Sequence, residues 1–214
     1  IRLSLVGSEM CIRDSPMEPM QTEERRLTVE RNVPVDALYM AFHMCSRNHP
    51  DYYAFDMLSD LLSSGRSSRF VQHLVQDKQI FNSIDAYISG SIDNGLFHIV
   101  GKPAPEKTLE EAEKAIWEEL ALLTEGSIDE NELEKVKNRY ESEQIFNNLN
   151  YLNVATNLAY FELIGKAEDI NTEVEKYRSV TQEQIKRAAK QTFLPENCSV
   201  LYYKAAAKGA SHTP

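Results

Sequence analysis

Alternating large apolar residues predict the strands of this chain. From Leu38 to Met44 every second residue is a large apolar one, which is typical of a strand with one buried face. The same alternation follows Phe81, and Asn94-Gly95 then gives a turn signal suited to a tight hairpin. The predicted strands are Arg26–Arg31, Leu38–Met44, Asn82–Ser89, Leu96–Val100 and Cys198–Tyr203.

Apolar residues spaced by three and four positions predict the helices. Three of these stretches open with a capping box, Thr108-x-x-Glu111, Ser127-x-x-Glu130 and Thr181-x-x-Gln184, in which side chains satisfy the free amides of the first turn. The other predicted helices are Ala54–Leu62, Ser67–Gln76 and Leu152–Leu163.

The order of these elements predicts an α+β fold, with a mainly antiparallel sheet and several long helices packed on one face. We expect a single domain over residues 16–204 and a small-residue tail over 205–214. Residues 1–15 show neither pattern and look like translated adapter sequence, so we expect them to be non-native. On that interpretation the true N-terminus is missing and the chain is a fragment.

The composition narrows the class of function. The formal net charge is −10 over 214 residues, which argues against a nucleic-acid binder, because phosphate binding needs an excess of Lys and Arg. No uninterrupted apolar stretch is long enough for a membrane span, so we expect no membrane partner. Three cysteines make no disulfide framework and favour a reducing compartment such as the cytoplasm.

The sequence offers no catalytic motif. Neither H-E-x-x-H, H-x-x-E-H, C-x-x-C nor G-x-S-x-G occurs, so we expect no catalytic residue, no metal ligand and no cofactor in this chain. The histidines are His43, His49, His73, His98 and His212. None has a second histidine three or four residues away.

One segment combines arginines and hydroxyls between two predicted helices. Arg66, Ser67, Ser68 and Arg69 are the candidate substrate-binding or anion-binding residues, because a helix N-terminus adds free amides to two cations. The alternative is a plain helix-to-helix turn, with Gly65 left-handed and Ser67 or Ser68 as N-cap. Both interpretations stay open at this point.

The same segment carries a family resemblance. Gly65-Arg66-Ser67-Ser68-Arg69-Phe70 resembles the Gly-x-Ser-Ser-Arg-Leu segment of the pitrilysin/insulinase-type zinc metallopeptidases, the inverzincins. Further similar segments follow in the family's order, and together they cover Thr22 to Tyr203. They are Val35–Met44, Asn48–Leu62, Gly126–Lys137 and Val180–Asn197.

The resemblance implies a role. In this family each subunit has two homologous α+β halves, and the N-terminal half carries H-x-x-E-H, the zinc and the general base. This chain is most similar to the non-catalytic C-terminal half, which closes the peptide chamber. The resemblance therefore implies zinc in the missing half and an inactive fragment here. It implies three partners: the chain's own N-terminal half, a homologous partner subunit in a dimer, and a peptide substrate.

Two positions depart from the family pattern. Where the second half helps to bind substrate, the family has an Arg and a Tyr seven residues apart, and the resemblance places Val75 and Asn82 there. A partner subunit would then supply that pair. Two alternatives stay open: a proteolytically inactive, structural subunit of a core or processing complex, and an autonomous module that binds an anion at residues 64–69.

Overall fold

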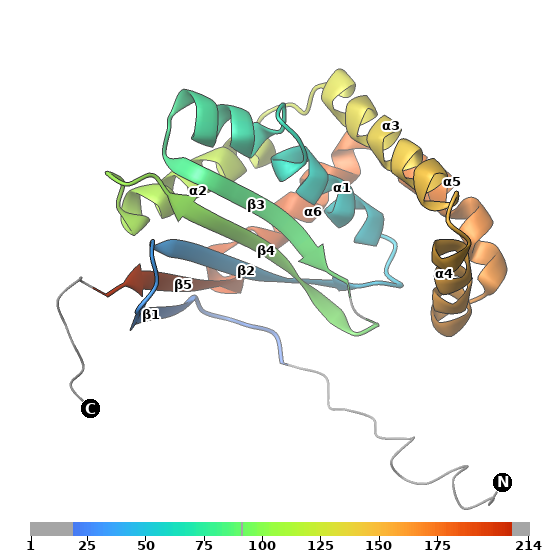
Figure 1. The fold of residues 1–214 in the computed structure, drawn as a ribbon, viewed down its shortest axis with the longest axis horizontal. Coiled ribbons are helices and arrows are strands. Elements are labelled where there is room, and N and C mark those ends of the chain that lie inside the picture. The colour runs from blue at the N-terminus through green and yellow to red at the C-terminus, as the bar shows by residue number, and fades with distance from the viewer. Residues whose placement is uncertain (1–18, 91, 207–214) are drawn as a thin grey trace, which may run out of the picture.

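The computed structural model describes residues 19–90 and 92–206, and a five-stranded sheet forms its centre (Figure 1). The strand order is β1-β5-β2-β4-β3; β1 and β5 are parallel and the other neighbours are antiparallel. The strands are β1 (Arg25–Arg31), β2 (Ala37–Ser46), β3 (Phe81–Ser89), β4 (Asn94–Pro103) and β5 (Cys198–Ala205). The predicted α+β class with a mainly antiparallel sheet is confirmed.

The helices cover one face of this sheet and extend past one end of it (Figure 1). They are α1 (Tyr52–Ser63), η3 (Phe70–Asp77), α2 (Leu109–Glu125), α3 (Glu130–Asn147), α4 (Tyr151–Ile164), η4 (Ala167–Thr172), α5 (Glu173–Arg178), α6 (Gln182–Thr192) and η5 (Pro195–Asn197). Helices α1, α2 and α6 pack on the strands, whereas α3, α4 and α5 lie beyond them. None of the helices in the described ranges is long and apolar enough to cross a bilayer.

The alternating apolar residues of β2 form the centre of the core. Leu38, Met40 and Phe42 are fully buried against the helices, as the period of two predicts. The predicted inner face of the last helix is also buried, with Ile185 and Ala188 inaccessible to solvent. Phe42 meets Phe193 and Trp117 edge-to-face and so joins the sheet to the helical layer.

The local structure departs from the sequence prediction in five places. Asp129, and not the predicted Ser127 box, caps α3, and Asn94 and Gly95 lie inside β4. The helix predicted from Ser67 begins at Phe70 and is π-helical through Asp77. Residues 167–178, for which no element was predicted, form η4 and α5. The predicted apolar stripe of α4 exists but faces solvent: Leu152 is 73% exposed.

Two of the predicted segments, residues 1–15 and 205–214, lie at the chain ends. The predicted non-native segment 1–15 lies outside the described residues, as does 207–214 of the predicted tail. Ala205, the first residue of the predicted tail, belongs to β5 in the structure. Its amide donates a hydrogen bond of 2.7 Å to Asp36.

Candidate functional site

The turn after α1 takes the left-handed conformation that the sequence predicts. Gly65 has a φ of +87°, which any residue with a Cβ adopts only with strain. The N-cap role predicted for Ser67 or Ser68 is wrong, because neither side chain caps η3. Instead the Ser68 hydroxyl, 3% exposed, donates to the Gly65 carbonyl at 2.8 Å and so stiffens the turn.

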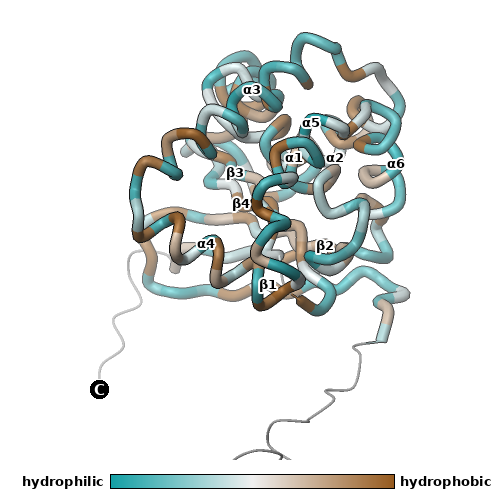
Figure 2. The backbone as a smooth tube through the Cα atoms, turned by 90° about the vertical axis from the view of Figure 1, so that its right-hand side faces the viewer, coloured by the Kyte–Doolittle hydropathy of each residue, from teal (hydrophilic) through white to brown (hydrophobic). Residues whose placement is uncertain are grey.

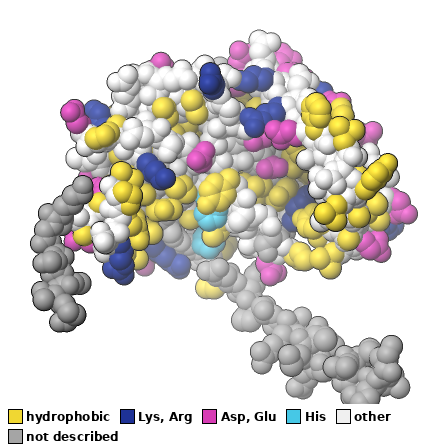
Figure 3. All heavy atoms as spheres, viewed as in Figure 1, with side chains coloured by type: hydrophobic (Ala, Val, Ile, Leu, Met, Phe, Trp, Pro, Cys, Tyr) yellow, Lys and Arg dark blue, Asp and Glu magenta, His cyan; other side chains and the backbone are white. Residues whose placement is uncertain are grey.

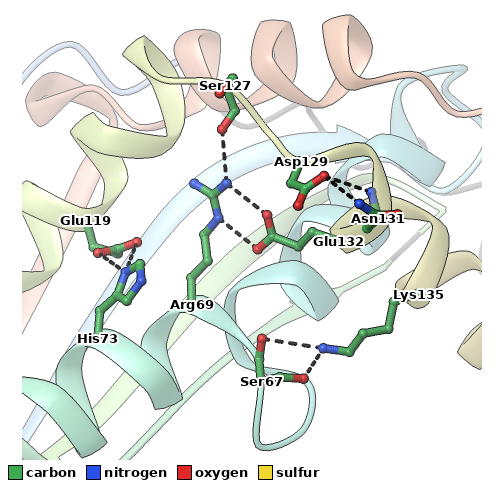
Figure 4. Close-up of polar contacts among 9 residues, drawn as sticks. All are labelled: Ser67, Arg69, His73, Glu119, Ser127, Asp129, Asn131, Glu132 and Lys135. Atoms are coloured by element: carbon green, nitrogen blue, oxygen red, sulfur yellow. Dashed lines mark hydrogen bonds and ion pairs between the residues drawn. The ribbon is translucent and has the colours of Figure 1, made fainter.

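The four candidate residues differ in their tertiary contacts, and Figure 4 shows the contacts of Ser67 and Arg69. The Arg69 guanidinium donates two bonds of 2.9 Å to the Glu132 carboxylate on α3, and Lys135 donates to the Ser67 hydroxyl. Arg66 is exposed, and none of the described residues forms an ion pair with it. The positive charge of Arg69 is therefore already balanced, and Arg66 is the cation of this segment that remains available to a ligand.

Beside this turn lies an open cavity of about 550 Å³ that Arg69, Glu132 and Lys135 help to line. Its far side is formed by His73 of η3, whose Nδ1 lies 2.9 Å from both carboxylate oxygens of Glu119 (Figure 4). Glu119 is buried, so this pair satisfies a carboxylate that would otherwise be costly inside the protein. The lining of this cavity carries both positive and negative side chains, so its charge gives no preference for an anionic ligand.

We expect Arg69→Gln to lower the free energy of unfolding by about 1–3 kcal/mol, because it leaves Glu132 without its bidentate partner. Arg66→Gln is the matched control and is expected to change it by less than about 0.5 kcal/mol. Urea denaturation of both variants measures the difference. Equal effects would show that the ion pair does not hold η3 to α3.

The described residues offer no metal site, since no group of three His, Cys, Asp or Glu side chains converges anywhere among them. His98 stacks on Tyr87 on the open side of the sheet, and burial lowers the pKa of its imidazole. His212 lies outside the described residues. Burial raises the pKa of Cys45 to about 11 and that of Cys198 to about 12, so both thiols are weak nucleophiles.

A second open cavity brings together the two residues that depart from the family pattern. Val75 of η3 and Asn82 of β3 both line a hollow of about 620 Å³, with Lys78 and Lys107 also at its wall. Sequence spacing alone gave no reason to expect these two side chains in one cavity. Neither is a guanidinium or a phenol, so the strong donors of the family pattern are absent at both positions.

Residues 19–90 and 92–206 leave two apolar surfaces without a covering layer of their own (Figure 3). On the open face of the sheet, Leu27, Leu201, Tyr39 and Val100 form one row across four strands, and they help to line a groove of about 360 Å³. The second surface follows the end of α3 and α4, where apolar residues alternate with polar ones along the helix (Figure 2). Its exposed members include Ile145, Phe146, Leu149, Tyr151, Leu152 and Leu163.

Comparison with known sequences places this fold in a family. The family described as "Peptidase M16 inactive domain" matches residues 9–140. The chain is 25% identical over 179 residues to the uncharacterized zinc protease YmxG of Bacillus subtilis, covering 83% of this chain and 43% of the relative. It is 23% identical over 188 residues to the zinc protease PqqE of Helicobacter pylori, covering 87% and 42%. The chain thus spans less than half the length of both.

Solved structures agree on the fold. A protease from Helicobacter pylori superposes with a TM-score of 0.84 at 22% identity, over 90% of this chain and 47% of that one. A chain of complex III2 from Candida albicans superposes with a TM-score of 0.69 at 19% identity, over 84% and 45%. The resemblance drawn from residues 65–70 is confirmed, and the chain belongs to the peptidase M16 inactive-domain family, the non-catalytic halves of pitrilysin/insulinase-type metallopeptidases.

Proposed function

We propose that this chain is the non-catalytic C-terminal half of a zinc-dependent endopeptidase subunit and that it closes the peptide chamber against the catalytic half. The observation that carries the proposal is the open face of the sheet. Helices among the described residues cover only one face of the sheet, and an apolar row on the other face favours a second layer there. On this open face, Leu27 is 61% exposed to solvent.

The protruding helix supports the same proposal. Of all residues in α4, only Phe161 is buried, and the helix packs mainly on η4. Patches of this kind on a folded domain mark interaction surfaces rather than ordinary solvent-exposed faces. We assign both surfaces to contacts with the catalytic half, because the curated relatives are more than twice as long as the matched region.

The zinc of such a subunit belongs to the other half in this proposal. The described residues of this chain do not fit a zinc site, so its own contribution is to wall the chamber, exclude water and align the peptide. The sheet edges β1 and β3 can add an extended peptide through main-chain bonds, which ignore side-chain identity. Val75 and Asn82 stand where the family pattern has an Arg and a Tyr. In this proposal a homologous partner subunit therefore supplies the hydrogen-bond donors that stabilise the transition state.

Of the segment Arg66–Arg69, one residue remains a candidate for contact with the peptide in this proposal. Arg66 is the candidate for contact with a peptide carboxylate, since Ser67, Ser68 and Arg69 have partners within the protein. As a peptide-contacting residue, Arg66 would act from the rim of the chamber without taking part in bond cleavage.

The alternative function is that of a proteolytically inactive subunit in a core or processing complex. The likeness to a chain of complex III2 is the observation that favours it. The two functions differ in the other half: an intact H-x-x-E-H there indicates a peptidase, and its loss indicates a scaffold.

We expect this chain to have no peptidase activity alone and to raise that of its catalytic half at least about tenfold on mixing, because closure excludes water and orients the substrate. A quenched fluorescent peptide measures the rate, and metal analysis is expected to find zinc in the catalytic half only. Leu27→Glu on the open sheet face is expected to abolish the stimulation. Leu122→Glu, similarly exposed at 57% but on α2, which packs on the other face of the sheet, should retain it. A rate that mixing leaves unchanged would contradict chamber closure.

A further inference from the structure

A polar cavity of about 340 Å³ lies among α1, α3, α4 and α5, next to the apolar surface along α3 and α4. Its inner wall includes the buried rings of Tyr52 and Tyr177, and its rim includes the exposed residues Asn148 and Tyr160. At about 30 Å³ per water molecule this space equals roughly ten waters. It is therefore large enough to admit a long side chain from outside.

The cavity already binds one guanidinium. Arg47 is buried, pairs with Glu173, and places its Cζ 4.4 Å from the centre of the Tyr52 ring. The Tyr53 ring lies 5.2 Å from the same Cζ, and its hydroxyl donates to Glu173 at 3.0 Å. Carboxylates and tyrosine faces are the usual surroundings of a desolvated arginine, so the local chemistry suits this group.

A second carboxylate in the cavity has no cation of its own. Asp56 accepts a hydrogen bond from the Tyr177 hydroxyl at Oδ2, while Oδ1 receives none from the described residues. The nearby cations Arg47 and Lys176 both form ion pairs with Glu173 instead. No described cation lies within ion-pair distance of Asp56, and burial raises the pKa of its carboxyl. Asp60 lies close enough for the charge of Asp56 to raise the pKa of Asp60.

We propose that this cavity binds the arginine side chain of a peptide, with Asp56 as its charge partner. Tyr140 and Tyr160 offer aromatic walls to the planar guanidinium. Side-chain amides complete the lining, and their oxygens accept the N–H groups that Asp56 does not reach. These amides are Gln144, Asn147, Asn148 and Asn157.

Arginine is preferred to lysine for a physical reason. The guanidinium is planar, more weakly hydrated and able to bond several acceptors at once, whereas an ammonium group loses a tighter hydration shell on entry. An anion is excluded because Asp56 and Glu173 both line the space. The assignment does not depend on chamber closure, since every residue involved belongs to this chain.

The test compares N-acetyl-arginine amide with N-acetyl-citrulline amide, which has the same shape but no charge. We expect the 214-residue chain to bind the arginine ligand at least about tenfold more tightly, as measured by chemical shifts of the isotope-labelled protein. The largest shifts are expected at Tyr52, Asn157 and Tyr160. Equal affinities, shifts centred elsewhere, or no binding would overturn the proposal.

Asp56→Asn is the decisive variant, because it removes the charge and keeps an oxygen for the Tyr177 hydroxyl. It is expected to abolish the preference for arginine over citrulline. Asp85→Asn, an exposed position on β3 with the same change in net charge, should retain it. A preference that survives in Asp56→Asn would contradict the assignment.

A second variant keeps the proposal testable if Asp56→Asn does not fold. Asn157→Asp adds a carboxylate to the partly exposed wall on α4 and is expected to tighten arginine binding about threefold without affecting citrulline. Adding the catalytic half is expected to leave the affinity unchanged. Loss of binding on that addition would overturn the assignment to a free peptide, since a residue of the other half would then occupy the cavity.

Discussion

Replacement of Arg47 by methionine is expected to lower the free energy of unfolding by about 3–5 kcal/mol. Both side chains of the Arg47–Glu173 pair are only 8% exposed, so the variant leaves a buried carboxylate without its guanidinium. The loss includes the contacts of Arg47 with the Tyr52 and Tyr53 rings. Urea denaturation followed by circular dichroism measures the change.

A double-mutant cycle separates the charge effect from the packing effect. Glu173→Gln in the Arg47→Met background removes the buried charge that has lost its guanidinium and keeps only Lys176 as ion-pair partner, and we expect it to restore about half of the lost stability. Arg31→Met, on the exposed edge strand β1, is the matched control and should change stability by less than about 0.5 kcal/mol. A loss of equal size at both arginines would refute the importance of the buried pair.

The second large effect concerns Asp60, whose replacement by asparagine is expected to stabilise the protein at pH 7. Burial and, to a smaller extent, the charge of Asp56 together raise the pKa of Asp60 from 3.8 to about 6. The folded state therefore binds a proton that the unfolded state releases between these values, so folding stability falls as the pH rises from about 4 to 6. At pH 7 the full loss of folding stability caused by the ionised Asp60 carboxylate is present.

The expected gain for Asp60→Asn is about 1–3 kcal/mol at pH 7, the upper value following from about 1.4 kcal/mol per pKa unit. The gain should shrink to a small fraction near pH 4, where the Asp60 carboxyl is protonated in the folded state and about half protonated in the unfolded state. Chemical denaturation of wild type and variant at pH 4 and pH 7 measures it, with Asp85→Asn as the exposed control. A gain of the same size at both pH values would exclude the titration of Asp60 as its cause.

Local pattern was enough to predict the elements that form the core. The alternation in β2 and after Phe81 predicted the central strands, because one buried face imposes a period of two. The tight turn predicted at Asn94-Gly95 is wrong, since both residues belong to β4 and neither has a positive φ. Helix α5 was not predicted, because residues 173–178 are mostly charged and Tyr177 alone is a large buried side chain. A single anchoring residue produces no periodic signal.

The sites depended on contacts between distant parts of the chain. Arg66 and Arg69 are close in sequence, yet Glu132, 63 positions beyond Arg69, binds only one of them. The cavity around Asp56 draws its walls from five separate elements, so no local spacing indicated it. Tyr52, Tyr140 and Tyr177 are far apart in the sequence, and only the fold brings their rings to one cavity.

The place of β5 between β1 and β2 has a consequence for biosynthesis. The Gln21 side chain donates to the carbonyl of Cys198, 177 residues later, and β1 has no other strand as neighbour. At about 5–20 residues per second, a ribosome needs about 10–35 s to make the intervening chain. During that interval β2 presents a bare edge to which chaperones and other nascent chains have access, so this domain completes its folding only after nearly all of it has been translated.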